Sequence, residues 1–211
     1  MVRTILCYGD SLTWGYDAAG PSRHAYEDRW PSVLQEALGA GARVIVEALN
    51  GRTTSFDDTL VWQDRNGARV LPTVLASHEP LDLVILALGT NDFKRHTGGG
   101  NASQSARGMK RLIEIVRGFP STFGYAAPEI LLVSPPRLAT SDNADFRDGL
   151  AFAAGEVARL PQLYAELASQ HGCDHFAASN FCEATPLDGV DLDAANTRAW
   201  GRAIARHLQQ D

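Results

Sequence analysis

The sequence predicts a doubly wound α/β sandwich, in which helices cover both faces of a parallel sheet. Strand-like apolar runs alternate with helical patterns about five times along the 211 residues, as they do in such folds. The run at 83–88 is apolar at every position, which is typical of a strand buried on both faces. Nearly every expected strand ends in a polar loop, so these loops should gather at one edge of the sheet.

The first half of the chain supplies two strands and two helices. An apolar strand at 3–8 leads into a turn, and the polar stretch 16–28 is expected to be a surface loop. A helix at 30–38 begins at a Trp-Pro pair, carries apolar residues at helical spacing and ends at glycines. A strand at 43–49, a polar loop and a short helix at 71–78 follow.

The second half supplies three strands and three helices. We expect the strands at 82–88, 129–134 and 174–177, and the helices at 103–117, at 148–169 and from 193 or 194 to about 208. We find no repeat, low-complexity segment or linker. The expectation is therefore a single domain over residues 1–211, with right-handed crossovers.

Composition and charge exclude several classes of function. Hydrophobic residues make up 45% of the chain and charged residues 21%, which is ordinary for a soluble globular protein. The net charge of -6 gives no electrostatic reason to expect nucleic acid or an anionic membrane as a partner. No apolar run approaches the ~20 residues of a membrane helix, and we see no signal peptide. We expect a cytoplasmic protein.

The cysteines and histidines indicate neither disulfides nor metal. Cys7, Cys173 and Cys182 form an odd set without an export signal, which favours reduced thiols. A pair between Cys173 and Cys182 would require an exported protein. No His/Cys cluster has the spacing of a zinc site, so we expect no metal and no cofactor.

Ser11 is the candidate nucleophile. It follows the carboxyl end of the first strand, where a helix is expected to begin and where ligands bind in open α/β sheets. A helix start offers free N–H groups and a positive dipole, which favour a developing oxyanion. A serine placed there can act as a nucleophile. The alternative is that Ser11 only caps the helix.

Two further strand ends supply candidate oxyanion donors. Gly51 follows the second strand and Asn91 the third. The N–H groups of Ser11 and Gly51 and the side-chain amide of Asn91 could donate to one oxygen, as acyl transfer requires. Gly51 suits this role because a missing Cβ lets a substrate approach the backbone. Taken singly, Gly51 could be a turn glycine and Asn91 a turn cap.

Together these residues resemble the SGNH hydrolases, also called the GDSL esterase/lipase family. Residues 9–12 (Gly-Asp-Ser-Leu) match the first block of that family, Asn50-Gly51 the second and residues 89–92 (Gly-Thr-Asn-Asp) the third. The likeness extends from residue 3 to about residue 208. Within the family the chain is most similar to the bacterial arylesterase and acyltransferase branch, through the segments at 7–15, 52–54, 88–92 and 133–136.

The resemblance implies a fold and a chemistry. It implies a flavodoxin-like three-layer sandwich with a five-stranded parallel sheet of order 2-1-3-4-5. It also implies short-chain ester substrates and a tendency to form homo-oligomers.

The last block departs from the family pattern, which is Asp-x-x-His before the final helix. Asp188 matches the aspartate that orients the histidine, and Asp191 stands where the histidine is expected. No other histidine is well placed to replace it; the six are His24, His78, His96, His171, His175 and His207. An aspartate is a poor substitute, because its pKa is near 3.9 against about 6.5 for histidine. Its neighbour Asp188 should raise the pKa of one carboxyl of the pair.

These residues predict a serine esterase that removes or transfers short acyl groups from aryl, alkyl or carbohydrate esters. Asp191 should make this chain a low-activity variant. The alternative is a catalytically dead member of the family that binds acylated small molecules or sugars. Because the other site residues are intact, we favour a variant of an active parent over a long-standing pseudoenzyme. A nucleotide-binding role is disfavoured, because the chain has no G-x-G-x-x-G loop.

Three apolar side chains are candidates for the walls of the substrate pocket. Trp14, Phe93 and Leu138 all lie on the loops expected at the sheet edge. Aromatic walls would suit aryl esters or acetylated sugars. The alternative for each is packing within its own loop.

Overall fold

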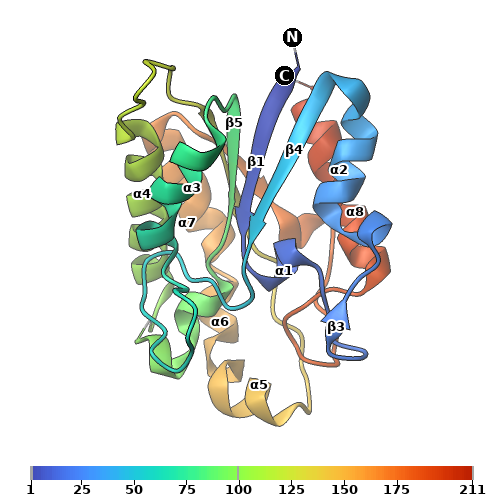
Figure 1. Cartoon of the computed structure of the whole chain (residues 1–211). Coiled ribbons are helices and arrows are strands. Elements are labelled where there is room, and N and C mark those ends of the chain that lie inside the picture. The colour runs from blue at the N-terminus through green and yellow to red at the C-terminus, as the bar shows by residue number, and fades with distance from the viewer. Residues whose placement is uncertain (1, 99, 211) are drawn as a thin grey trace.

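Five strands form one parallel sheet, and their order confirms the predicted order. The computed structural model describes residues 2–98 and 100–210. The strands are β1 (Arg3–Gly9), β4 (Ala42–Ala48), β5 (Leu83–Ala87), β6 (Glu129–Ser134) and β7 (Asp174–Ala177), and they lie in the order β4-β1-β5-β6-β7 (Figure 1). Numbered along the chain, this is the order 2-1-3-4-5. All four pairings are parallel, so the carboxyl ends of the strands meet at one edge.

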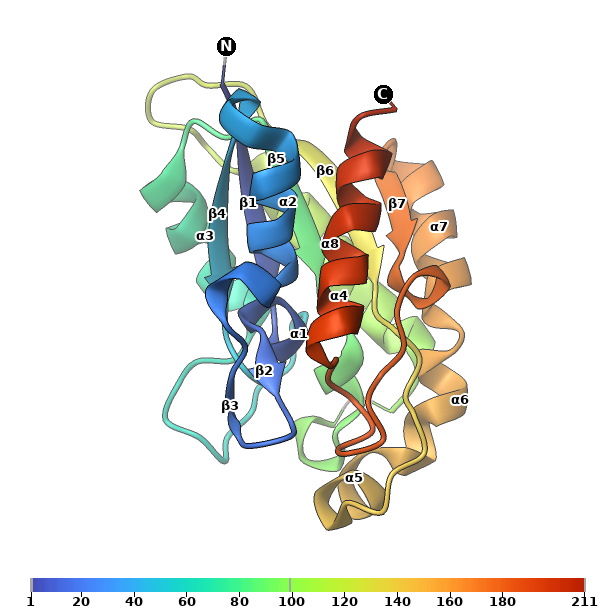
Figure 2. The same cartoon turned by 90° about the vertical axis from the view of Figure 1, so that its right-hand side faces the viewer.

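Helices cover both faces of the sheet. One face carries α3 (Gly67–His78), α4 (Ala102–Gly118) and α7 (Leu160–His171), and the other carries α2 (Trp30–Leu38) and α8 (Ala194–Leu208) (Figures 1 and 2). The apolar residues of β1 alternate between the two cores accordingly. Leu6 and Tyr8 join the α3/α4/α7 side, and Ile5 and Cys7 join the α2/α8 side.

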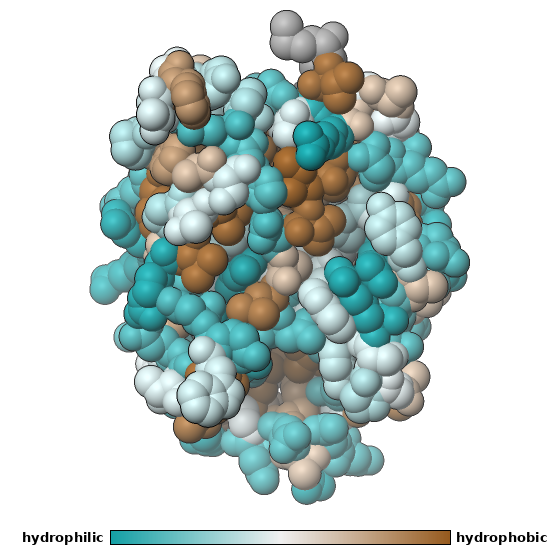
Figure 3. All heavy atoms as spheres, viewed as in Figure 1, coloured by the Kyte–Doolittle hydropathy of each residue, from teal (hydrophilic) through white to brown (hydrophobic). Residues whose placement is uncertain are grey.

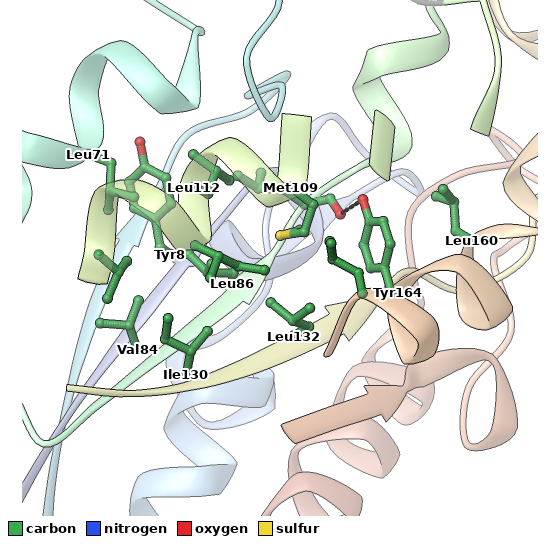
Figure 4. Packing of buried hydrophobic residues seen from close by; sticks show 14 of the residues in the cluster. Tyr8, Leu71, Val84, Leu86, Met109, Leu112, Ile130, Leu132, Leu160 and Tyr164 are labelled. Carbon is green, nitrogen blue, oxygen red and sulfur yellow. Dashed lines mark hydrogen bonds between the residues drawn. The ribbon is translucent and has the colours of Figure 1, made fainter. Parts of the chain in front are cut away.

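The core on the α3/α4/α7 side is closely filled. Figure 4 shows Leu86 and Leu132 on the sheet beneath Met109 and Leu112 of α4. The opposite core includes Trp30 and Trp200, whose rings stack with centroids 5.2 Å apart. Outside these cores, the face shown in Figure 3 is mostly hydrophilic, with hydrophobic residues scattered across it.

Two segments differ from the sequence expectation. The predicted long helix 148–169 is wrong: the chain forms α5 (Ala144–Gly149), a 3₁₀ turn, α6 (Ala154–Val157) and then α7. Leu150 turns out of helical geometry (φ -143°) to enter the core, and Pro161 in the first turn of α7 has no N–H to continue an earlier helix. The predicted loop 16–28 contains a small antiparallel hairpin, β2 (Tyr16–Asp17) with β3 (Ser22–Arg23).

A buried carboxyl group ties together two of the loops at the carboxyl edge. Asp92 follows β5 and accepts hydrogen bonds from the N–H and hydroxyl of Thr54, which follows β4, at 2.8 Å each. The Ser105 hydroxyl of α4 donates to the same carboxyl at 2.6 Å. Gly108 of α4 allows this approach, since a Cβ there would lie 2.0 Å from Thr54 Oγ1. The β4–α3 and β5–α4 loops are therefore held against each other.

In the described part of the chain, no helix combines the length and the apolar character needed to cross a membrane.

Removing the stacked indole of Trp200 should destabilise the fold strongly. Trp200 is 1% exposed and packs on Trp30, so Trp200→Ala should lower the free energy of unfolding by about 3–5 kcal/mol. The matched control is Trp62→Ala, because the Trp62 side chain is fully exposed and its loss should change stability by less than about 0.5 kcal/mol. Denaturant unfolding of both variants measures this, and equal effects would contradict the packing described.

Candidate functional site

The structure brings the five predicted catalytic and oxyanion residues to one cavity. This cavity, of about 660 Å³, opens at the carboxyl edge of the sheet. Its lining includes Ser11, Gly51, Asn91, Asp188 and Asp191. They come from four loops that are distant in sequence, and the parallel sheet is what gathers them.

Ser11 is the first residue of α1 (Ser11–Trp14), and it is not the cap of that helix. Asp10 occupies the cap position, where its Oδ1 accepts the Leu12 N–H at 3.1 Å. Gly15 ends the helix in a left-handed conformation (φ 89°) that favours glycine. The alternative interpretation of Ser11 as a helix cap is therefore wrong, and its hydroxyl is available at the cavity wall.

The Asn91 amide is held in place from two sides. Its Nδ2 donates to Asp10 Oδ2 at 3.1 Å and to the Arg52 carbonyl at 3.2 Å. Asp10 and Arg52 are both buried, so the amide has a fixed orientation in the lining of the cavity that Ser11 also lines. A substrate oxygen would have to share or replace one of these bonds. Burial raises the pKa of the Asp10 carboxyl to about 7, and the Leu12 N–H and nearby cations oppose this shift.

Gly51 is covered by an arginine that sequence reasoning missed. Gly51 has a φ of 81°, and a Cβ placed on it would lie 2.6 Å from Arg65 Cζ. The Arg65 guanidinium therefore packs directly on the glycine expected to donate to an oxyanion. Arg65 Nη1 donates to Asp58 Oδ2 at 2.7 Å, and the side chain of Asp58 is fully buried. No local pattern in the sequence connects positions 51 and 65.

The two aspartates near the last helix have different roles. Asp188 Oδ1 accepts the N–H groups of Val190 and Asp191 at 2.9 Å each, and so shapes the turn. Asp191 is buried, and its Oδ1 has no hydrogen-bond partner among the described residues. Burial raises the pKa of Asp191 well above its ordinary value, and Asp188 raises it further, while the Ser11 hydroxyl favours the charged form. Asp191 is thus the carboxyl that faces Ser11.

The described histidines form no hydrogen bond with the proposed catalytic residues. His96 lines the cavity, but its Nε2 lies 3.3 Å from Asp58 Oδ2. His24 is buried, and its Nε2 lies 2.9 Å from the Leu192 carbonyl oxygen. Within residues 2–98 and 100–210, no hydrogen bond joins a histidine to Ser11, Asp188 or Asp191.

The three predicted wall residues are not among those that line the cavity. Phe93 is fully buried in the α3/α4/α7 core, and Leu138 packs against the same core. The Arg23 guanidinium lies over the Trp14 ring, with Arg23 Cζ 4.5 Å from the centroid of that ring. The sequence places all three on edge loops, but it does not show which way a loop side chain points.

The actual walls combine apolar and charged side chains. The apolar lining comes from Tyr16, Phe146, Leu150 and Val190, and the polar lining beyond the predicted residues comes from Asn50, Arg65, Lys94, Arg95, His96, Asn143, Asp145 and Asp148. Several of these belong to α5 and its flanks, and most of them precede residue 148, where the predicted long helix was expected to begin. No cluster of three or more metal-ligating side chains occurs in the described ranges, and the three cysteines are free.

Comparisons with known proteins show the family and the fold. A family model described as the GDSL-like lipase/acylhydrolase family matches residues 7–209. A carbohydrate acetylesterase family member from Sinorhizobium meliloti is 51% identical with a TM-score of 0.94, and the match covers 99% of this chain and 98% of that one. A second carbohydrate acetylesterase from the same organism is 37% identical, with a TM-score of 0.92 and 99% of each chain covered. The aryl esterase of M. smegmatis is 39% identical, with a TM-score of 0.90 and 99% of each chain covered. No curated protein sequence matches.

Replacing Asp10 with Asn should stabilise the protein progressively as the pH rises. The raised pKa of about 7, against 3.8 ordinarily, means that the folded chain holds a proton that the unfolded chain has released. The stability due to this proton is complete below about pH 4 and is lost as the pH rises through about 7. Asn keeps the cap but does not ionise. Between about pH 5 and pH 8 the unfolding free energy of Asp10→Asn, relative to the parent, should therefore increase by about 1–3 kcal/mol.

Denaturant titrations at the two pH values measure this difference. Asp193→Asn is the matched control, since Asp193 caps α8 at the surface through the Asn196 N–H. A relative stability of Asp10→Asn that stays constant with pH would contradict a buried, proton-binding Asp10.

Proposed function

Because the chain belongs to the GDSL-like lipase/acylhydrolase family, we propose that it is a serine esterase whose nucleophile is Ser11. The observation that carries this proposal is the convergence of Ser11, Gly51 and Asn91 on one cavity at the carboxyl edge of the sheet. Its substrates are esters of short acyl groups, such as acetyl, with aryl, alkyl or carbohydrate alcohols. The acetylesterases and aryl esterase to which it is similar support this substrate class.

The chemistry begins with attack of Ser11 Oγ on the ester carbonyl. The carbonyl oxygen becomes an oxyanion, which the N–H groups of Ser11 and Gly51 and the Asn91 amide stabilise. Asp191 accepts the proton of the Ser11 hydroxyl and passes it to the alkoxide that leaves when the C–O bond of the tetrahedral intermediate breaks, and an acyl-serine remains. Water then hydrolyses this acyl-enzyme, or a second alcohol accepts the acyl group. A small alcohol added to the assay separates hydrolysis from transfer.

Asp191 takes the place of a histidine base in this scheme. The raised pKa of Asp191 makes its carboxylate a stronger base than that of an exposed aspartate. Burial also favours the protonated form, however, and that form cannot accept the proton of the Ser11 hydroxyl. Removing the histidine of a serine triad lowers the rate by on the order of 10⁶ in subtilisin. We therefore expect slow turnover, with Asp188 shaping the turn that presents Asp191.

A catalytically inactive binder of acylated molecules is the second candidate. The observation that favours it is that no described histidine contacts Ser11, while the cavity and its donors are intact. A binder would take up an aryl acetate in calorimetry without releasing the phenol. An esterase would release it, and Ser11→Ala would abolish the release. The size of the assembly, which the family resemblance predicts to be oligomeric, is measured by light scattering.

Replacing Asp191 with His should raise esterase activity. An imidazole beside Ser11 would accept its proton near neutral pH and return it to the leaving alcohol, which is worth about 10²–10⁴-fold. The kcat/KM for 4-nitrophenyl acetate should rise by about that factor. Asp193→His, two residues further along and at the surface, is the control and should leave the rate unchanged. An unchanged rate in a folded Asp191→His variant would show that the base lies at another position.

A further inference from the structure

We propose that the esters this cavity prefers carry a carboxylate, which Lys94 and Arg65 bind. The inference rests on the proposed esterase function and specifies the substrate class of the same site. It depends on how charge is distributed over the cavity, on which cations are already paired, and on where the unpaired donors lie.

Four basic side chains line the cavity. They are Arg65, Lys94, Arg95 and His96, which we call the cationic wall. Four aspartates, Asp145, Asp148, Asp188 and Asp191, line the same cavity and come from α5 and the β7–α8 loop. The cationic wall comes from the β4–α3 and β5–α4 loops, which lie against each other (Figure 1). In a chain of net charge -6, such a gathering of cations is not a consequence of composition.

The pairing within the cationic wall leaves two donors unused. Asp58 is the shared acid, at 2.7 Å from Arg65 Nη1 and 3.3 Å from His96 Nε2. Arg95 lies over the Phe152 ring and donates from Nε to the Asp148 carbonyl. Arg65 Nε, by contrast, is buried and has no partner among the described residues. Over residues 2–98 and 100–210, neither a hydrogen bond nor an ion pair engages the Lys94 ammonium.

An unpaired cation in this position favours an anionic ligand. Burial lowers the pKa of Lys94 and the nearby Arg65 lowers it further, while Asp58, Asp10 and Asp191 oppose this shift. Among the described residues none of these carboxyl groups forms an ion pair with the ammonium, which therefore has no direct partner. Buried charges in proteins are generally paired. A carboxylate from a bound ligand would supply the missing partner for Lys94, and a second oxygen could reach the Arg65 fork.

The position of Arg65 relates this anion site to the reacting bond. The guanidinium packs on Gly51, whose N–H is a proposed oxyanion donor. A carboxylate on the cationic wall therefore lies in the same cavity as an ester carbonyl held at Gly51.

A matched pair of aryl acetates tests the proposal. The two esters are 3-acetoxybenzoate, which is anionic, and methyl 3-acetoxybenzoate, which is neutral and has the same acyl group. The kcat/KM of the anionic ester should exceed that of the neutral ester, and 0.5 M NaCl should reduce the preference. In Lys94→Met the ratio of anionic to neutral kcat/KM should fall at least tenfold, because a charge-assisted hydrogen bond is lost. Lys110→Met, at an exposed lysine of α4, should keep the ratio of the parent.

The outcomes separate the substrate class from the esterase function. Hydrolysis of both esters with equal kcat/KM, or a ratio that Lys94→Met leaves unchanged, would overturn the carboxylate proposal while the esterase stands. If neither ester is hydrolysed, calorimetric titration decides. Tighter binding of 3-acetoxybenzoate, weakened in Lys94→Met, would support the carboxylate site and refute the esterase. Equal binding of the two esters would overturn the carboxylate site.

Discussion

The carboxyl group of Asp92 is the point on which the candidate site depends. It accepts three hydrogen bonds in a fully buried position, from the backbone and hydroxyl of Thr54 and from Ser105. Burial raises the pKa of Asp92 to about 6, and these three donors act in the opposite direction. Together with the bond from the Asn91 amide to the Arg52 carbonyl and the contact of His96 with Asp58, this junction fixes the β4–α3 loop relative to the β5–α4 loop. Buried polar groups of this kind are costly when only partly satisfied, so the junction makes loop placement specific.

The loops that line the cavity are anchored in different ways. The cationic wall belongs to loops anchored through Asp92 and through Asp58. The aspartates of the lining belong to the turn that Asp188 shapes and to α5, a short helix that carries exposed residues over much of its length. A substrate carboxylate bound as proposed would contact the loops that buried carboxyl groups anchor.

Sequence reasoning was reliable where a physical rule acts over several consecutive residues. The apolar run of β5 and the boundaries of α2, β6 and β7 were predicted, because burial imposes a clear pattern on them. The cavity residues Ser11, Gly51 and Asn91 were found because parallel strands bring their carboxyl ends together. The prediction of one helix at 148–169 failed at two residues. Leu150 leaves helical geometry to pack in the core, and Pro161 has no N–H with which to continue an earlier helix. The partners of Arg65, and the direction of Trp14 and Phe93, depend on tertiary contacts that no local pattern records.

Asp10 caps α1, so the residue that stabilises the start of this helix is not Ser11, the proposed nucleophile. Ser11 contributes its backbone to the helix, but its side chain is not the cap. The buried Oδ1 of Asp191 has no hydrogen-bond partner among the described residues. A side-chain atom without a hydrogen-bond partner can be replaced without breaking a hydrogen bond of the fold. A substitution at position 191 would therefore change the proton acceptor of the proposed reaction without removing a hydrogen bond that the fold needs. The chemistry at this position can vary independently of the structure that surrounds it.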